Sequence, residues 1–274
     1  MKNKIKKIHF IGIGGSGMSG IAEVMHNLGF YVSGSDSVSS KVTTELKKMG
    51  IKIFLKHDTR NIKNVDVIVV SSAISKRNIE LKSAQNKNIP IIPRAEMLSE
   101  LMRFKKGIAV AGTHGKTSTT SILASILSEG KLDPTFVVGG RINSMKANAK
   151  LGSGDLFVVE ADESDASFLH LNPVTTILTN IDREHLETYQ GDFKRLKSTY
   201  LDFIHQVPFY SNVFLCIDDR EIKNLMPFIS RPMVTYGLSK KAHIRAFNLV
   251  HSEERMSFYA VSYTHLRAHE TADN

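Results

Sequence analysis

Short apolar runs alternate along most of the chain with segments in which apolar residues recur every three or four positions. The runs predict buried strands, and the recurring pattern predicts helices with one buried face. Their regular alternation is typical of an α/β fold with a parallel sheet and crossover helices. In the first part of the chain, the expected strands are Ile5–Ile13, Phe30–Ser35, Ile51–Phe54, Val65–Ser71 and Ile89–Ile92. The expected helices there include Ser19–Leu28, Thr43–Met49, Asn78–Asn86 and Ala95–Met102.

A second strand–helix series follows a short basic link at residues 103–107. Its expected strands are Ile108–Ala111, Phe136–Val138, Leu156–Glu160, Thr175–Leu178, Val213–Ile217 and Met233–Tyr236. A helix is expected over Thr119–Ser128, with one apolar face formed by Ile122, Leu123, Ile126 and Leu127. Weak alternation across residues 243–261 predicts a β-hairpin.

The chain is expected to divide into two domains, because the charge balance changes where the second series begins. Residues 1–104 contain 17 Lys and Arg against 8 Asp and Glu, whereas residues 105–274 contain 19 of each. We therefore expect a Rossmann-like parallel-sheet domain over 1–104 and a second α/β domain over 105–261. Residues 262–274 show little apolar periodicity and are expected to be a disordered or non-native tail.

Composition excludes several classes of protein. With 274 residues, 42% of them hydrophobic and 23% charged, the chain is neither disordered nor fibrous. Its single cysteine cannot form an internal disulfide, which excludes a secreted disulfide scaffold. No stretch approaches the ~18 apolar residues of a membrane span, and the start has no signal-peptide apolar region. We expect a cytoplasmic protein without membrane insertion.

The positive charge of the first domain indicates an anionic partner. Nucleic acid and a phosphorylated small molecule both meet that description. The chain has no compact run of Lys and Arg with interleaved aromatic residues, and it has no Trp for base stacking. The prediction is therefore a phosphorylated small molecule and no nucleic acid, although a solvated basic surface would give the same charge.

The clearest chemical motif is a glycine-containing loop between the expected strand Ile108–Ala111 and the helix that follows. Strand, glycine turn, Lys, hydroxyl and helix is the context of a phosphate-binding loop, in which backbone N–H groups and a Lys surround the phosphates. The common pattern has Gly at position 110, where this chain has Val110, so the loop is a shorter variant. Thr117 is placed to hold Mg²⁺. The predicted phosphate-binding residues are Gly112, Thr113, His114, Gly115, Lys116, Thr117 and Ser118.

A second glycine-rich loop follows the first strand. Gly12, Gly14 and Gly17 satisfy G-x-G-x-x-G, and Asp36 ends the next strand about twenty residues on, as in a dinucleotide fingerprint. Read alone, this motif favours an NAD-dependent oxidoreductase. A UDP-sugar fits equally well, because the loop requires only a diphosphate at the helix N-terminus. Tight packing of strand on helix would also explain the glycines.

Two further polar segments follow expected strands of the second domain. Glu160 begins an acidic cluster that continues to Asp165, and a carboxylate at this strand end is where a second ligand for Mg²⁺ belongs. Asp162, Glu163 and Asp165 serve equally well as loop acids. His185, in the segment after the strand Thr175–Leu178, is a candidate metal ligand or phosphate contact.

Together these elements resemble the Mur ligase family, from about residue 7 to about residue 250. The motifs that carry the resemblance are His9–Met18, Ser71–Ile74, Arg94–Leu98, Ala111–Thr117, Glu160–Leu169, Thr179–Ile181 and Thr188–Phe193. The resemblance implies a first domain that binds a UDP-sugar and a P-loop-type central domain that binds ATP and Mg²⁺. Within the family, the stretch Asp162–Leu169 is most similar to members that join L-alanine to the carboxylate of UDP-N-acetylmuramate, through an acyl phosphate, in peptidoglycan precursor synthesis.

The resemblance also implies roles for individual residues. Lys116 and His114 are expected to be catalytic, and the metal ligands are expected to be Thr117, Glu160 and His185. The expected substrate-binding residues are Gly12, Gly14, Gly15, Ser16, Gly17, Met18, Asp36, His57 and Ser72. One departure stands out: Glu184 precedes His185 where the family usually has Asp, which leaves the role of this carboxylate open.

Family members also carry a third, C-terminal domain and an Asn-rich segment that contacts adenine. The resemblance fades before either, so we expect the third domain to be absent and this chain to be a truncated product that is inactive alone. Two other functions remain open from the sequence: an NAD-dependent oxidoreductase that uses the loop Gly12–Gly17, and a non-catalytic module that binds a nucleotide sugar.

Overall fold

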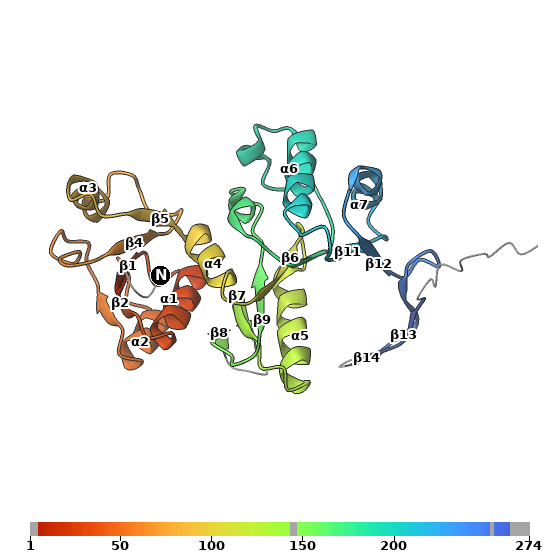
Figure 1. The fold of residues 1–274 in the computed structure, drawn as a ribbon, viewed down its shortest axis with the longest axis horizontal. Helices are drawn as coiled ribbons and strands as arrows, with labels where there is room; N and C mark the ends of the chain where they lie inside the picture. The colour runs from red at the N-terminus through yellow and green to blue at the C-terminus, as the bar shows by residue number, and fades with distance from the viewer. Residues whose placement is uncertain (1–4, 143–146, 253–254, 264–274) are drawn as a thin grey trace, which may run out of the picture.

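A computed structural model describes residues 5–142, 147–252 and 255–263 and confirms the α/β class. The first sheet has five parallel strands in the order β3-β2-β1-β4-β5 (Figure 1). Its strands are β1 (Lys7–Ile11), β2 (Tyr31–Ser35), β3 (Lys52–Phe54), β4 (Val67–Val70) and β5 (Ile91–Pro93). Each lies within or beside an apolar run that predicted it. The helices are α1 (Ser16–Asn27), α2 (Lys41–Lys48), α3 (Ile79–Asn86) and α4 (Arg94–Met102).

Apolar residues on both faces of the first sheet are buried, as expected for a parallel sheet covered by helices. Ile8 and Phe10 of β1 belong to a buried cluster with residues of α1, α2 and α4. Ile11 and Ile68 belong to a second cluster, which includes Leu81 of α3. The sheet is therefore the middle of three layers.

The second sheet has nine strands in the order β14-β13-β12-β11-β10-β6-β9-β7-β8. All neighbours from β13 to β7 are parallel, whereas β8 and β14 are antiparallel to their partners. Its strands are β6 (Lys106–Ala111), β7 (Thr135–Ile142), β8 (Ala147–Lys150), β9 (Leu156–Glu160), β10 (Thr175–Leu178), β11 (Val213–Cys216), β12 (Met233–Gly237), β13 (Ile244–Ser252) and β14 (Arg255–Ser262). The helices are α5 (Lys116–Glu129), α6 (Phe193–His205) and α7 (Arg220–Leu225), with 3₁₀ turns η1 (Ser167–His170), η2 (Leu186–Tyr189) and η3 (Met226–Phe228).

Helix α5 was predicted correctly, but of its predicted apolar face only Leu123 and Leu127 pack on the core. Ile122 and Ile126, expected to face the core, are 60% and 62% exposed. Thr120 and Ala124 are buried instead, because the helix lies on the sheet along a line of smaller side chains. Leu123 flanks this line and packs against the apolar cluster of β7 and β9.

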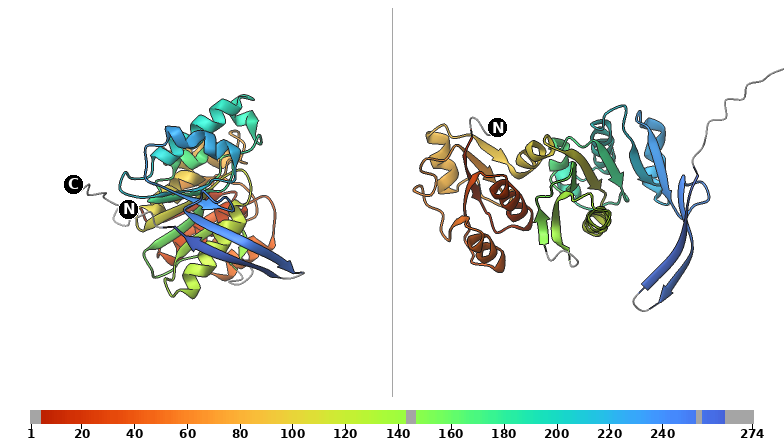
Figure 2. Two further views of the ribbon diagram at one scale, coloured as in Figure 1. Left: turned by 90° about the vertical axis from the view of Figure 1, so that its right-hand side faces the viewer. Right: turned by 60° about the horizontal axis from the view of Figure 1, so that its bottom comes forward.

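The predicted hairpin is present as β13 and β14, and it extends away from the rest of the second sheet (Figure 2). Strand β8 and helices α6 and α7 were not predicted. The expected tail 262–274 lies outside the described residues from residue 264 onward. No helix in the described part of the chain is long and apolar enough to span a membrane.

Helix α1 joins the two sheets by packing against β7 and β8 of the second (Figure 1). Gly20 permits this approach, because a Cβ there would lie 3.0 Å from Ala149 Cβ and 3.2 Å from Val137 Cγ1. The amide of Asn148 donates a hydrogen bond to Ser19 Oγ at 3.3 Å. This packing brings the loop before α1 close to the second domain.

Candidate functional site

Both glycine loops lie where ligands bind in open α/β sheets, beyond the carboxyl ends of strands at which the strand order reverses. Strand β1 lies between β2 and β4, and the loop Gly12–Gly15 follows it. Strand β6 lies between β10 and β9, and the loop Gly112–Gly115 follows it. The topology therefore gives each domain one crevice with a glycine loop at its floor.

The loop after β6 requires two of its glycines for their backbone conformation. Gly112 has φ +134° and Gly115 has φ +78°, values that L-residues with side chains rarely adopt. A Cβ on Gly112 would also overlap Thr179 Oγ1 and lie 2.9 Å from Asn180 O. The strand end and the neighbouring loop after β10 are therefore packed backbone to backbone.

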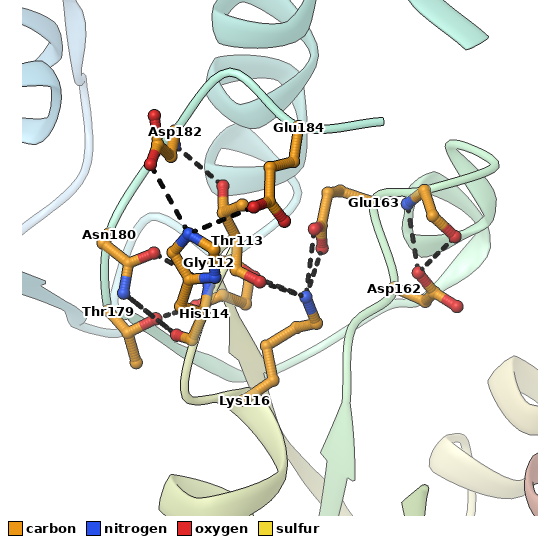
Figure 3. Close-up of polar contacts among 12 residues, drawn as sticks. Gly112, Thr113, His114, Lys116, Asp162, Glu163, Thr179, Asn180, Asp182 and Glu184 are labelled. Carbon is orange, nitrogen blue, oxygen red and sulfur yellow. Dashed lines mark hydrogen bonds and ion pairs between the residues drawn. The ribbon is translucent and has the colours of Figure 1, made fainter. Parts of the chain in front are cut away.

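Thr179 and Asn180, after β10, hold this loop in place (Figure 3). Asn180 Oδ1 accepts from His114 N at 2.8 Å, and Asn180 Nδ2 donates to His114 O at 2.9 Å. Thr179 Oγ1 donates to the same carbonyl at 2.8 Å. From the sequence, this segment was noted only for its family resemblance and for His185. Hydrogen bonds from side chains to the backbone of a distant loop leave no recognisable local sequence pattern.

The ammonium group of Lys116 turns back over the loop (Figure 3). Its Nζ donates to Gly112 O at 2.7 Å and to Thr113 O at 3.0 Å, and it lies 2.9 Å from Glu163 Oε2. The Glu163 side chain is 1% exposed, and burial raises its pKa despite the bond from Lys116. From the sequence, Glu163 was no more than a loop acid; here it is the counter-ion of the loop Lys.

Glu160, at the end of β9, fits a divalent cation together with Thr117. Burial raises the pKa of Glu160, although a hydrogen bond from Thr117 opposes the shift. Its Oε1 is buried and has no hydrogen-bond partner among the described residues. A hard cation such as Mg²⁺ prefers such oxygen ligands. His185, the third expected ligand, is exposed and makes no hydrogen bond or ion pair in the described ranges.

His114 faces two acidic side chains across the loop. Its Nε2 lies 3.5 Å from Asp182 Oδ2 and 3.8 Å from Glu184 Oε1 (Figure 3). The pKa of Asp182 is lowered, first by the N–H of Arg183 and then by His114. The Glu that departs from the family pattern therefore contacts the predicted catalytic histidine.

In the first domain, Ser35 and Asp36 at the end of β2 shape the glycine loop. Ser35 O accepts from Gly12 N at 2.8 Å and from Ile13 N at 3.1 Å. Asp36 Oδ2 accepts from Gly14 N at 2.8 Å, while Oδ1 accepts from Val38 N at 3.1 Å. Both carboxylate oxygens thus bind backbone, and contact between Asp36 and a sugar stays a prediction.

One cleft of about 310 Å³ is lined by residues of both domains, including the starts of α1 and α5. The predicted substrate residues Gly15, Gly17, Met18 and Ser72 line it together with Lys116 and Glu160. The remaining lining residues are Ser71, Arg94, Leu98, Val137, Gly139 and Asp162. Several predicted site residues do not line this cleft. In the first domain they are Gly12, Gly14, Asp36 and His57, and in the second Gly112, Thr113, His114, Gly115, Thr117, Ser118 and His185. Ser16 is the first residue of α1.

Arg94, the first residue of α4, is a cleft residue that the sequence did not assign. Its Nη2 lies 3.6 Å from Asp162 Oδ2. Burial would raise the pKa of Asp162, but hydrogen bonds from Ser164 and the charges of Arg94 and Lys116 lower it. Arg94 therefore places a positive charge beside the loop of the first domain and the acidic segment of the second.

The basic excess of residues 1–104 is mostly elsewhere, because Arg94 is their one basic side chain in the lining of this cleft. A separate cavity of about 630 Å³, at the amino ends of β1, β2 and β3, is lined by Lys7, Lys52, Arg60 and Lys63. The positive charge of the domain is therefore not concentrated at this cleft.

Sequence comparisons identify relatives of this chain. Residues 7–106 match the family model "Mur ligase family, catalytic domain", and residues 110–271 match "Mur ligase middle domain". The UDP-N-acetylmuramate–L-alanine ligase of Azoarcus sp. (strain BH72) is 56% identical over 258 residues, which cover 94% of this chain and 55% of that protein. The protein of the same name from Polaromonas naphthalenivorans (strain CJ2) is 55% identical, over 95% of this chain and 54% of that protein. The chain thus spans about half the length of the curated relatives it matches.

Solved structures share the fold. The UDP-N-acetylmuramate–alanine ligase of Thermotoga maritima superposes with a TM-score of 0.82 at 31% identity, over 94% of this chain and 58% of that one. A UDP-N-acetylmuramate:L-alanyl-γ-D-glutamyl-meso-diaminopimelate ligase from Neisseria meningitides gives 0.84 at 26% identity, over 94% of this chain and 85% of that one. Sequence and fold agree over both sheets and both glycine loops, and this chain belongs to the Mur ligase family.

Proposed function

We propose that this chain binds UDP-N-acetylmuramate and ATP for a ligase that joins L-alanine to the muramate carboxylate in the cytoplasm. The observation that carries the proposal is one cleft lined by residues of both domains, with Lys116 and Glu160 from the second domain and Gly15 and Gly17 from the first. The relatives named UDP-N-acetylmuramate–L-alanine ligase also support the proposal, because they match 94% or more of the chain.

The diphosphate of the sugar nucleotide would lie on the glycine loop of the first domain. Gly15 is the N-cap of α1, and no side chain caps this end, so the first backbone N–H groups of the helix are available to an anion. Gly17 and Met18 line the cleft beside it, with Ser72 from the loop after β4. The carboxylate on the sugar would then point toward the second domain.

The triphosphate of ATP would lie on the loop after β6. Lys116 is tied to Glu163 in this structure, so phosphate oxygens would replace the carboxylate and the loop carbonyls as its partners. Thr117 and Glu160 would hold Mg²⁺, which neutralises charge between the phosphates and the attacking carboxylate. His185 remains a proposed third ligand, reached only if its loop moves.

The reaction needs positive charge, because a carboxylate must approach a triphosphate. Attack of the carboxylate oxygen on the γ-phosphorus gives an acyl phosphate and ADP, and the amine of alanine then attacks the carbonyl carbon and expels phosphate. Lys116 and Arg94 would stabilise the negative charge gathered in the first step. His114 would contact the transferring group from the open side of the loop.

Thermal unfolding with added ligands tests the proposal. A ligand at 100 times its Kd stabilises the folded state by about 2.7 kcal/mol. UDP-N-acetylmuramate and Mg-ATP should each raise the melting temperature, and NAD should not. Lys116→Met is the matched control, since it should lose the response to ATP and keep the response to the sugar nucleotide. Stabilisation by NAD alone would support an oxidoreductase instead, and stabilisation by the sugar nucleotide alone would support a non-catalytic module.

A further inference from the structure

A buried polar cluster lies on the face of the first sheet that α3 covers, away from the cleft. It consists of His9, Ser35, His57, Asn61 and Glu80, which we name the Glu80 cluster. The side chain of Glu80 is fully buried, and its Oε2 accepts from Ser35 Oγ at 2.6 Å and lies 2.7 Å from His57 Nδ1. Its Oε1 accepts from Asn61 Nδ2 at 2.7 Å and lies 3.6 Å from His9 Nε2. A carboxylate buried with this many donors is uncommon unless it orders its surroundings.

The local sequence holds Glu80 as an anion. Asn78 caps α3, and its Oδ1 accepts from Glu80 N at 2.8 Å, so the carboxylate lies in the first turn, at the positive end of the helix. Burial would raise the pKa of Glu80, but the nearby His9 ring and the hydrogen bonds from Ser35, His57 and Asn61 outweigh it and bring the pKa to about 2. The Glu80 carboxyl group is therefore ionised near neutral pH.

Ser35 connects this anion to the glycine loop. Its hydroxyl donates to Glu80, while its carbonyl accepts from both Gly12 N and Ile13 N. The next residue, Asp36, accepts from Gly14 N. Three successive N–H groups of the loop therefore donate to residues at the end of β2. The hydrogen bond to Glu80 fixes the side-chain rotamer of Ser35.

Glu80 also fixes the orientation of His57. An ionised carboxylate only accepts hydrogen bonds, so Nδ1 of His57 carries the hydrogen that Oε2 accepts. Its Nε2 has no hydrogen-bond partner among the described residues. The His57 side chain is 21% exposed and follows β3, at the same edge of the sheet as Asp36. One buried anion therefore contacts the residues that follow or end two neighbouring strands, β2 and β3.

We propose that Glu80 is a positioning residue for the sugar nucleotide, which sets the backbone of the loop Gly12–Gly14 through Ser35 and the ring of His57 directly. The inference rests on the proposed function, since it concerns the same substrate. Loss of the anion would leave the Ser35 hydroxyl and the His57 ring without a fixed acceptor. The loop amides would then spread over several conformations, and the diphosphate would bind more weakly.

Calorimetric titration of the whole chain with UDP-N-acetylmuramate, and separately with Mg-ATP, tests this inference. Glu80→Gln keeps the shape of the side chain and removes the charge. Loss of one hydrogen bond to a charged group corresponds to about a tenfold or larger rise in Kd, and we expect this for the sugar nucleotide. The Kd for Mg-ATP should not change, because the loop after β6 makes no contact with the cluster.

Leu81→Ala is the matched control, since Leu81 neighbours Glu80 on α3 and packs only in the apolar cluster with Ile11 and Ile68. It should lower the melting temperature and leave the Kd for the sugar nucleotide unchanged. Ser35→Ala should raise that Kd, and the double variant with Glu80→Gln should bind no more weakly than Glu80→Gln alone, because both changes break one connection.

The results separate the possible failures. Unchanged Kd in Glu80→Gln, or an equal rise in Leu81→Ala, overturns the positioning role. Additive effects of Ser35→Ala and Glu80→Gln overturn the route through Ser35. If Glu80→Gln does not fold, Ser35→Ala decides alone, by raising the Kd or leaving it unchanged. An unmodified chain that does not bind the sugar nucleotide overturns the proposed function itself, and this inference with it.

Discussion

Replacement of Lys116 by Met should destabilise the protein in the absence of any nucleotide. The ammonium group is the one cation within bonding distance of the Glu163 carboxylate in the described residues, and that side chain is 1% exposed. Met keeps most of the aliphatic stem, so packing changes little. The variant therefore leaves a buried carboxylate without its counter-ion.

Two physical limits set the size of the effect. An unpaired buried carboxylate that stays ionised costs about 3–5 kcal/mol. A carboxyl group that takes up a proton instead costs about 1.4 kcal/mol for each pH unit above its unfolded pKa of about 4.3, or about 4 kcal/mol at pH 7.5. The carboxyl group takes whichever state costs less free energy, so we expect the free energy of unfolding to fall by about 3–4 kcal/mol. In a chain of this size that corresponds to roughly 10 °C in melting temperature.

The loss should depend on pH in a defined direction. Burial already raises the pKa of Glu163 with Lys116 present, and removal of the cation raises it further. A group whose folded pKa lies above its unfolded value contributes its full stability only below the unfolded pKa, and that stability is lost as the pH rises through the folded pKa. The deficit relative to the unmodified chain should therefore be small near pH 4.5 and complete by about pH 7.5.

Urea unfolding at pH 5 and pH 7.5 measures this effect. Adding Glu163→Gln to Lys116→Met should restore most of the stability at pH 7.5, because no charge is left to desolvate, yet it should not restore ATP binding. A Lys116→Met variant as stable as the unmodified chain at pH 7.5 would refute the reasoning. So would a double variant no more stable than the single one.

Three further predictions concern the nucleotide site. Gly112→Ala should abolish the stabilisation by Mg-ATP and keep that by the sugar nucleotide, because the new Cβ overlaps Thr179 and φ is +134°; a normal ATP response in thermal unfolding contradicts this. Asn180→Ala should raise the Kd for Mg-ATP about tenfold in calorimetry, since it frees His114 N and leaves His114 O with Thr179 alone; an unchanged Kd would show that binding does not need the Asn180 hydrogen bonds. Removal of Mg²⁺ with a chelator should weaken ATP binding in the unmodified chain and have little effect in Glu160→Gln; equal weakening in both excludes Glu160 as a ligand.

The elements that the sequence predicted are those with a local signal. Most of the predicted strands lie within or beside short apolar runs, and the loop before α5 has the required strand, glycine turn and helix around it. Helix α6 was missed although Leu196, Tyr200 and Phe203 recur at helical spacing and are buried. Strand β8 was missed because the segment Ala147–Lys150 is short and contains no large apolar residue.

The face of α5 and the partners of the charged groups depend on tertiary packing. Ile122 and Ile126 make an apolar stripe that the sheet does not cover, because Thr120 and Ala124 permit a closer approach. Glu163 stands 47 residues from Lys116 in the sequence, among several acids of similar appearance. Ion pairs such as Lys116–Glu163 depend on which loop the fold buries. The sequence alone does not show this.

The most direct test of the central claim asks whether the sugar nucleotide and Mg-ATP occupy the cleft together, which does not require turnover. Mg-ATP is titrated by calorimetry into the chain alone and into the chain saturated with UDP-N-acetylmuramate. We predict one bound molecule of each ligand per chain, with Mg-ATP still binding when the sugar nucleotide is present. Competition between the two ligands for one site, or no binding of UDP-N-acetylmuramate, would contradict the account.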